Sequence, residues 1–211
     1  MTLSKIEDAI AALAQGGMVV VVDDESRENE GDIIVASEAV TPETIAFMMK
    51  HACGLICVAM EGERLDALDI PLMVPQNTEY HKTAFTVSVD YLLGTTTGIS
   101  AADRAATVQA LMDTAAAPDD FARPGHIFPL RAHPDGVRGR PGHTEAAVDL
   151  ARLAGKAPSG VICEVANDDG TMARLPELVA FAALHGLPLI SIEDLIAFIE
   201  ARQDGSAAQA A

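Results

Sequence analysis

Short apolar runs bounded by glycine, proline or charge recur along this chain. Such runs are typical of strands that are buried in a sheet. They occupy residues 18–22, 32–37, 55–60, 84–90, 126–132, 160–165 and 187–192. The run at 126–132 contains a proline, which predicts that this strand lies at an edge or a bend of the sheet.

Helical spacing of apolar residues appears between several of these runs. In the first helix, Ile6, Ile10 and Leu13 form an apolar stripe, and Ser4 and Glu7 have the spacing of a capping box. Later helices are predicted where Pro42 occupies a first helical position and where Ser100 caps a first turn. The predicted helices cover, in order, 4–15, a segment from 42, 100–112, 143–153, 175–186 and 193–202.

Strands and helices interleave irregularly, which favours an α/β (α+β-like) domain with a mixed sheet flanked by helices. The chain of 211 residues has no internal repeat and no linker-like segment. We therefore predict a single catalytic domain over residues 1–202. The small and polar segment 203–211 is predicted to be a flexible tail.

Composition excludes several classes of protein. The 14 basic and 31 acidic residues give a net charge of −17, so no basic surface for nucleic acid or an anionic membrane is expected. No apolar run approaches the ~20 residues of a membrane span, and the N-terminus lacks the apolar core of a signal peptide. These features predict a cytoplasmic protein. Among the three cysteines, Cys57 lies in a strand-like run and is expected to be a core thiol.

One stretch, "DDESRENEGD" at 23–32, carries six carboxylates and follows directly on a predicted core strand. Alternate residues of an extended segment point the same way, so Glu28, Glu30 and Asp32 would converge. Converging carboxylates need a cation, and hard oxygen ligands suit Mg²⁺ or Mn²⁺. Gly31 indicates a close backbone approach or a positive φ. A solvated loop in an acidic protein is the alternative.

A second stretch, "RGRPGHTEA" at 138–146, leads into a predicted helix. Helix N-termini offer free N–H groups to anions, to which Arg140 and Thr144 would add contacts. His143 is able to ligate a metal or carry a proton. An ordinary helix start with a surface histidine would explain the same pattern. The hydroxyl-rich "GTTTGISAADR" at 94–104 would contact a phosphate or sugar, or form an ordinary capped turn.

Two single residues are further candidates. Glu164 interrupts the apolar run "GVICEV", so it lies either at the strand's end or partly buried, where it would suit proton transfer. His126 begins the run at 126–132, where a histidine is more often structural.

Taken together, the chain resembles the 3,4-dihydroxy-2-butanone 4-phosphate synthase family from about Ile6 to about Ile199. Six segments carry the resemblance in order: "DDESRENEGD", "FTVSVD", "TTTGISAADRAATV", "RPGHIFPLRA", "RPGHTEAAVDLARLAG" and "ICEVANDDGTMAR".

The resemblance implies site residues. It implies that Glu28 and His143 bind a divalent metal, Mg²⁺ or Mn²⁺, and that Glu164 and His126 are essential to activity. With Asp32, these two are candidates for acid–base catalysis. The implied substrate-binding residues are Arg27, Glu28, Asp32, Thr97, Arg140, Pro141, Gly142, His143, Thr144 and Glu164.

The resemblance also implies an activity and an assembly. The family converts D-ribulose 5-phosphate to L-3,4-dihydroxy-2-butanone 4-phosphate and formate, in riboflavin biosynthesis, without an organic cofactor. Its reaction begins with proton abstraction beside a carbonyl and needs several proton transfers. A homodimer is implied, in which His126 reaches the neighbour's site. Clustered carboxylates also occur in metal-dependent phosphohydrolases and nucleases, and a non-catalytic metal- or phosphate-binding module is a further alternative.

Overall fold

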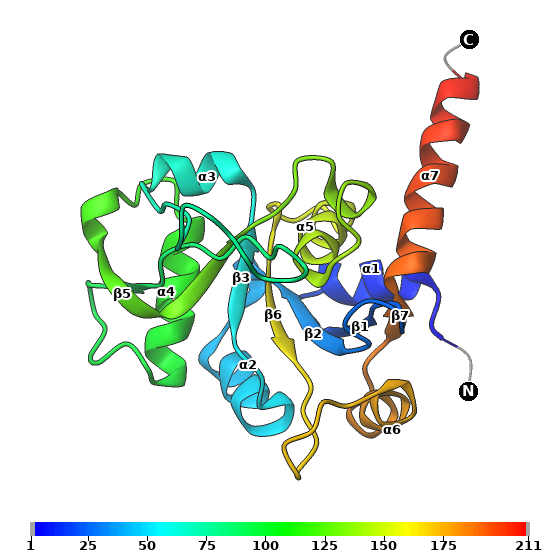
Figure 1. The fold of residues 1–211 in the computed structure, drawn as a ribbon, viewed down its shortest axis with the longest axis horizontal. Helices are drawn as coiled ribbons and strands as arrows, with labels where there is room; N and C mark the ends of the chain where they lie inside the picture. Colours follow the sequence, from blue (N-terminus) through cyan, green and yellow to red (C-terminus); the bar gives the residue numbers. More distant parts are fainter. Residues whose placement is uncertain (1–2, 210–211) are drawn as a thin grey trace.

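The fold is a mixed α/β domain, seen in a computed structural model that describes residues 3–209 (Figure 1). Its seven-stranded sheet has the order β4-β5-β3-β6-β2-β1-β7 over the described residues. The β1–β7 and β3–β5 pairs are parallel and the other pairs are antiparallel, so the predicted mixed sheet is confirmed. The strands are β1 (Val19–Val22), β2 (Gly31–Ala36), β3 (Cys57–Met60), β4 (Val89–Tyr91), β5 (Phe121–Arg131), β6 (Ser159–Glu164) and β7 (Leu189–Ser191).

Helices cover both faces of the sheet. The α-helices are α1 (Ile6–Ala14), α2 (Pro42–Phe47), α3 (Gly62–Ala67), α4 (Ala101–Met112), α5 (His143–Leu153), α6 (Leu175–His185) and α7 (Ile192–Gln209). Val20 and Val22 of β1 belong to one core cluster, with residues of α2, α4 and α6. Val19 and Val21 belong to the other, with residues of α1, α5 and α7. The period of two along a strand thus divides one apolar run between two cores.

Local sequence signals account for several helix ends. The Thr41 hydroxyl accepts a hydrogen bond from Thr44 N at the start of α2, and Ser100 Oγ accepts one from Asp103 N at the start of α4. Gly186 ends α6 with φ +65°, a conformation that favours glycine. Cys57 is buried in the core, as predicted.

Other predicted boundaries were wrong. Ser4 does not cap α1, which begins at Ile6; its hydroxyl instead accepts a hydrogen bond from Leu189 N. The last helix continues to Gln209, beyond the predicted end at Arg202. The flexibility of the segment 203–211 stays a prediction, and its residues 210 and 211, like 1 and 2, lie outside the described residues.

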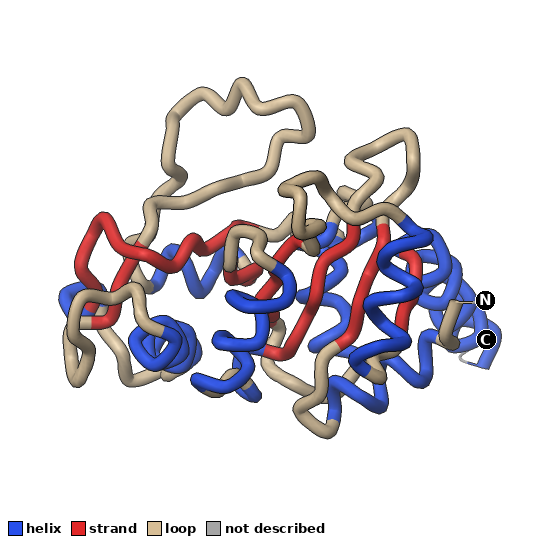
Figure 2. Tube along the Cα trace, turned by 90° about the horizontal axis from the view of Figure 1, so that it is seen from below, coloured by secondary structure: helices blue, strands red, loops and turns tan. Residues whose placement is uncertain are grey.

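The predicted strand at 84–90 forms a regular strand only at its end, in β4, while Phe85 makes an isolated bridge with Leu130 of β5. Residues 71–88 are mostly loop, and Figure 2 shows the long loop between α3 and β4 standing out from the body of the protein. The run at 126–132 was predicted to lie at an edge or a bend of the sheet. The edge is excluded, because the first part of β5 pairs with β4 and its second part with β3, and the bend stays a prediction. Between residues 3 and 209, no helix combines the length and apolar character needed to cross a bilayer.

Candidate functional site

Three segments that are far apart in the sequence meet where the neighbouring strands β1, β2 and β6 begin or end, a region called here the site edge of the sheet. Asp32, at the start of β2, lies opposite Val21 in β1 and opposite Glu164 at the end of β6. The acidic loop at 23–30 joins β1 to β2 at this edge. Helix α5 begins beside it, since His143 Nε2 lies 3.1 Å from the carbonyl oxygen of Val21.

The acidic loop is organised by Asp23. Its carboxylate accepts hydrogen bonds from the backbone nitrogens of Glu28 (3.1 Å) and Glu30 (2.9 Å), and from Arg27 Nη1 (2.8 Å). A Cβ on Gly31 would lie 2.5 Å from the side chain of Leu178, so this side chain packs directly against the glycine, in agreement with the close approach that was one of its two predicted alternatives. The loop is therefore shaped by hydrogen bonds and packing, unlike a freely solvated loop.

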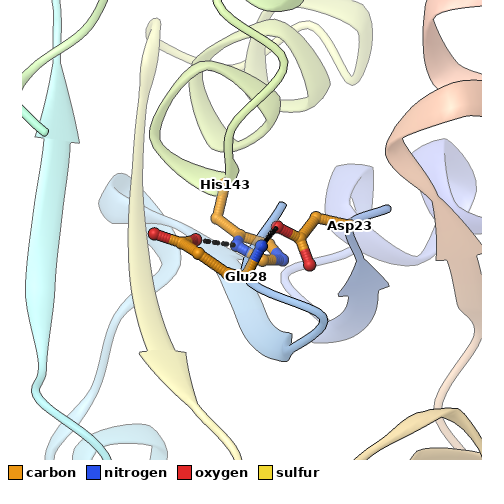
Figure 3. A group of neighbouring side chains, drawn as sticks. All are labelled: Asp23, Glu28 and His143. Atoms are coloured by element: carbon orange, nitrogen blue, oxygen red, sulfur yellow. Dashed lines mark hydrogen bonds and ion pairs between the residues drawn. The ribbon is translucent and has the colours of Figure 1, made fainter. Parts of the chain in front are cut away.

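His143 is buried between the carboxylates of this loop (Figure 3). The Val21 carbonyl can only accept, so Nε2 carries a proton and Nδ1 is directed toward the acids. Nδ1 lies 3.7 Å from Glu28 Oε2 and 3.6 Å from Asp32 Oδ1. Such a hydrogen bond on the far nitrogen is the usual support of a metal-binding histidine.

The charges at this edge compensate one another. Burial raises the pKa of Asp32 to about 8, and the neighbouring Glu164 and Glu28 carboxylates add to the shift. Burial alone would lower the pKa of His143, but Asp32 and Glu28 outweigh it and raise that pKa to about 9. The interaction with His143 and the Arg27 charge hold the pKa of Glu28 at about 2. In the metal-free chain, the protonated ring of His143 therefore supplies the positive charge that balances the surrounding carboxylates.

These residues fit a divalent cation. Ligand atoms from Asp23, Glu28 and His143 lie within 4.8 Å of one another, and Asp32 Oδ1 is buried without a hydrogen-bond partner in the described part of the chain. Carboxylate oxygens with a single imidazole form a donor set that suits Mg²⁺ or Mn²⁺. Glu28 and His143 were predicted from the resemblance. Asp23 was missed, although its place directly after a core strand was a signal.

Two guanidinium groups face the start of α5. A Cβ on Gly142 would lie 2.4 Å from Arg140 Nη1 and 3.0 Å from Arg27 Nη2, so both arginines pack against this glycine. Gly142 is the N-cap residue and has no side chain to cap the helix, which leaves first-turn N–H groups for an anion. Thr144 is buried in the same turn.

Arg140 is held in place by its neighbours. Nη1 donates to Glu145 Oε2 (2.7 Å), Nη2 to Thr83 Oγ1 (2.7 Å) and Nε to the carbonyl of His81 (3.2 Å). Since a guanidinium has five N–H bonds, one remains on each terminal nitrogen. Arg140 is therefore oriented by the protein while still able to bind an anion.

Cation-binding and anion-binding groups share one cavity of about 160 Å³. Its lining includes eight residues predicted from the sequence: Arg27, Glu28, Glu30, Asp32, Arg140, His143, Thr144 and Glu164. Glu79 and Thr83 also line it. Glu79 and Thr83 were missed because they lie on the long loop, whose position over the cavity has no local sequence signal.

Glu164 occupies the wall of this cavity. It ends β6 and is half-buried, so the two predicted alternatives, the strand's end and partial burial, hold together. Its Oε2 accepts a hydrogen bond of 2.8 Å from Leu55 N, and a Cβ on Gly54 would lie 2.6 Å from the same oxygen. The carboxylate is thus oriented by backbone on one side and borders the cavity on the other.

Three predicted residues lie elsewhere in this chain. His126 is on β5 with its side chain 43% exposed, and its ring contacts Asp90. Thr97 is exposed in the loop that precedes α4. Pro141 is exposed and lines a different cavity, between the acidic loop and α7. None of the three lines the cavity that contains Glu28 and His143.

We expect Gly142→Ala to weaken binding of an anion such as phosphate at the start of α5. The new methyl group would displace Arg140 or Arg27, while the backbone of residue 142 (φ −122°) accepts alanine without strain. One hydrogen bond to a charged group contributes about 1.5–3 kcal/mol, so the Kd for inorganic phosphate should rise roughly tenfold or more. The melting temperature and Mg²⁺ affinity serve as controls, and an unchanged Kd would contradict the assignment.

We expect Asp32→Asn to stabilise the metal-free protein at alkaline pH. The pKa of this buried carboxyl is raised from 3.8 to about 8, so its contribution to stability is full below pH 3.8 and is lost as pH rises through 8. Asparagine does not ionise, and its advantage should grow across that window to roughly 1–3 kcal/mol, the usual cost of an unpaired buried polar group. Chemical denaturation at several pH values in EDTA would measure it. An advantage that is the same at pH 4 and pH 8.5 would contradict the assignment.

The fold and the cavity define a class: a mixed α/β domain in which residues that fit a divalent cation adjoin residues that fit an anion at the start of a helix. A family model described as 3,4-dihydroxy-2-butanone 4-phosphate synthase matches residues 7–198. The chain belongs to that family.

Relatives and solved structures agree with this membership. The chain is 72% identical over 200 residues to 3,4-dihydroxy-2-butanone 4-phosphate synthase of Agrobacterium fabrum, covering 95% of this chain and 94% of the relative. It is 60% identical to riboflavin biosynthesis protein RibBA of Synechocystis, covering 92% of this chain but 35% of that longer protein. A solved 3,4-dihydroxy-2-butanone 4-phosphate synthase in complex with two magnesium ions superposes with a TM-score of 0.91 at 50% identity, covering 95% and 98% of the two chains.

Proposed function

We propose that this chain converts D-ribulose 5-phosphate to L-3,4-dihydroxy-2-butanone 4-phosphate and formate. The observation that carries the proposal is the shared cavity, in which carboxylates and His143 adjoin the two arginines at the start of α5. A sugar phosphate needs both halves, one for its vicinal oxygens and one for its phosphate. Family membership makes this reaction the natural choice among those that such a cavity would support.

The residues divide between binding and proton transfer. Arg140, Thr144 and the first turn of α5 hold the phosphate, and this remote binding orients the reacting carbons. Glu28 and His143, with Asp23 beside them, would hold Mg²⁺ or Mn²⁺. Such an ion stabilises the negative charge that develops on substrate oxygens when a proton leaves carbon. No organic cofactor is needed for these steps.

Two acids face the substrate from neighbouring strands. Asp32 and Glu164 lie opposite each other in the sheet, on the face covered by α5. Asp32 is buried beside Glu164 and Glu28, which raises its pKa in the metal-free chain, and a buried carboxyl of this kind suits a group that takes and returns a proton. Glu164 is held by Leu55 N and is the second acid–base group. Two such groups satisfy a reaction that needs more than one proton transfer.

A direct assay tests the proposal. Purified chain, D-ribulose 5-phosphate and Mg²⁺ should release formate in equal amount to the four-carbon product, without inorganic phosphate. A metal-dependent phosphohydrolase would release phosphate instead, and a binding module would release neither. Chelation should abolish formate release, and Mg²⁺ or Mn²⁺ should restore it.

We also propose that the chain acts as a homodimer in which His126 completes the neighbour's site. His126 is half-exposed and lies outside its own chain's cavity. Asp90 and Gly98 lie against it, and the chain beside these two residues carries the exposed apolar side chains of Leu92, Leu93 and Ile99. An essential residue outside the cavity is most simply explained if it serves a second copy.

Mixing two inactive variants should restore activity if sites are shared. In a heterodimer of His126→Ala and Glu164→Gln chains, one site retains both functional residues and the other lacks both. With random exchange of equal amounts, about a quarter of wild-type formate release should return. Each variant alone is the control. Light scattering of tagged chains would show that the subunits have exchanged. If formate release after exchange then stays at the level of the separate variants, the shared site is contradicted.

A further inference from the structure

A second cluster of polar groups lies away from the cavity, where β4 meets β5. Both carboxylate oxygens of Asp90 bind one residue: Oδ1 accepts a hydrogen bond from His126 N (2.8 Å), and Oδ2 lies 2.6 Å from His126 Nδ1. The side chain of Asp90 is 12% exposed, whereas that of His126 is 43% exposed. A buried acid thus holds an exposed imidazole by two bonds.

This contact determines the state of the ring. An ionised carboxylate only accepts, so Nδ1 carries a proton, and in the neutral form of the ring Nε2 then keeps its lone pair. Among the described residues, no hydrogen bond is made to Nε2. The ring therefore presents one defined nitrogen outward, as in the arrangement by which an acid orients a catalytic histidine.

The backbone of β4 is shaped to make the contact. The register between β4 and β5 shifts between Val89 and Asp90, and irregularities of this kind redirect side chains. Gly125, next to His126, allows the two strands to approach, since a Cβ there would lie 2.0 Å from the carbonyl carbon of Val89. The Ser88 hydroxyl accepts a hydrogen bond from Gly125 N and fixes the same junction.

A loop covers the carboxylate–imidazole bond. A Cβ on Gly98 would lie 2.0 Å from Asp90 Oδ2 and 2.7 Å from His126 Nδ1, so the loop backbone rests on the pair, and φ +87° also favours glycine there. Buried Asp103 holds this loop: it accepts hydrogen bonds from Thr96 N, Thr96 Oγ1 and Gly98 N. Exclusion of water strengthens the covered bond.

We infer that Asp90 is a positioning residue for His126, which fixes the tautomer and direction of its imidazole beneath the loop at 96–98. The inference rests on the proposed function, in which His126 is needed for turnover. It also gives a role to two segments, "FTVSVD" and "TTTGISAADR", that contribute little to the cavity. A purely structural brace between β4 and β5 is the competing explanation.

Asp90→Asn separates the two explanations. Asparagine keeps the size of aspartate, but its amide is able to donate to Nδ1 and thereby favours the opposite tautomer. Ser88→Ala is the matched control, because it removes a side-chain hydrogen bond at the same junction without touching His126. Measurements on each purified variant are melting temperature, kcat and KM for formate release, and ¹⁵N–¹H NMR of the His126 ring, assigned by its loss in His126→Ala.

We expect Asp90→Asn to lower kcat by roughly 10²-fold or more, the scale of a misplaced acid–base group, with KM changed far less. The His126 signal should move from the Nδ1–H to the Nε2–H form. Ser88→Ala should keep both the tautomer and kcat. In the double variant, Asp90→Asn should add no further loss to that of His126→Ala.

Equal losses of kcat in Asp90→Asn and Ser88→Ala, or an unchanged His126 tautomer, would overturn the inference. The NMR comparison needs no turnover, so it decides the inference even where the wild-type chain releases no formate, a result that would instead reject the proposed function.

Discussion

Glu28→Gln is expected to reduce metal-dependent formate release by about 10³-fold or more. A divalent cation contributes several kcal/mol of transition-state stabilisation, and each ~1.4 kcal/mol corresponds to a factor of ten in rate. Glutamine keeps the shape of the side chain but offers a weaker, uncharged ligand. It also removes a charge that faces both His143 and Arg27. His143→Ala should produce a similar loss, because it removes the nitrogen that faces Glu28 and Asp32.

The measurement combines turnover with metal binding. Formate release is titrated with Mg²⁺ and Mn²⁺, and calorimetry gives metal affinity for the same preparation. His133→Ala, a change at an exposed histidine outside the cavity, is the control and should keep both properties. Wild-type metal affinity in Glu28→Gln and His143→Ala, or full activity after exhaustive chelation, would reject this metal site.

Glu164→Gln is expected to lower kcat by roughly 10²-fold or more, the usual loss of a general acid–base group. Glutamine retains the oxygen that accepts from Leu55 N, so the end of β6 should stay in place. It is unable to take or return a proton. The variant should therefore fold and dimerise, and should bind Mg²⁺ and ribulose 5-phosphate with affinities near those of the wild type.

A structural role for Glu164 predicts a different pattern. The melting temperature would fall while activity per folded molecule stayed nearly constant. Glu43→Gln, an exposed position in α2, is the control for the chemical change itself. Thermal stability, substrate affinity and formate release measured on one preparation distinguish these outcomes. Formate release close to the wild-type rate would remove Glu164 from the mechanism.

Local patterns in the chain were sufficient to predict most elements and much of the site. The apolar run at 18–22 predicted a buried strand, and Val19–Val22 of β1 are all buried. Thr41 and Ser100 begin helices through their own hydroxyls. Six ordered segments also carried the family resemblance, and with it Glu28, His143 and Glu164. These signals are readable because each depends on residues close together in the sequence.

Other features depend on contacts between distant segments. Ser4 has the spacing of a cap, but a hydrogen bond to Leu189 N places it on β7 instead, and the run at 84–90 leaves most of its length in a loop. No local rule indicates either result, because a nearby partner in space competes with the local preference of the segment.

The sequence alone determined the chemical inventory: the carboxylates at 23–32, the arginine and histidine before a helix, and an acid in an apolar strand. Only the tertiary structure decided how these groups meet. Sheet register places Asp32 opposite Glu164, and Val21 orients the ring of His143 through its carbonyl. The burial of these groups decides their protonation, because desolvation and neighbouring charges act through space. The same packing leaves His126 outside the cavity of its own chain and joins it to Asp90.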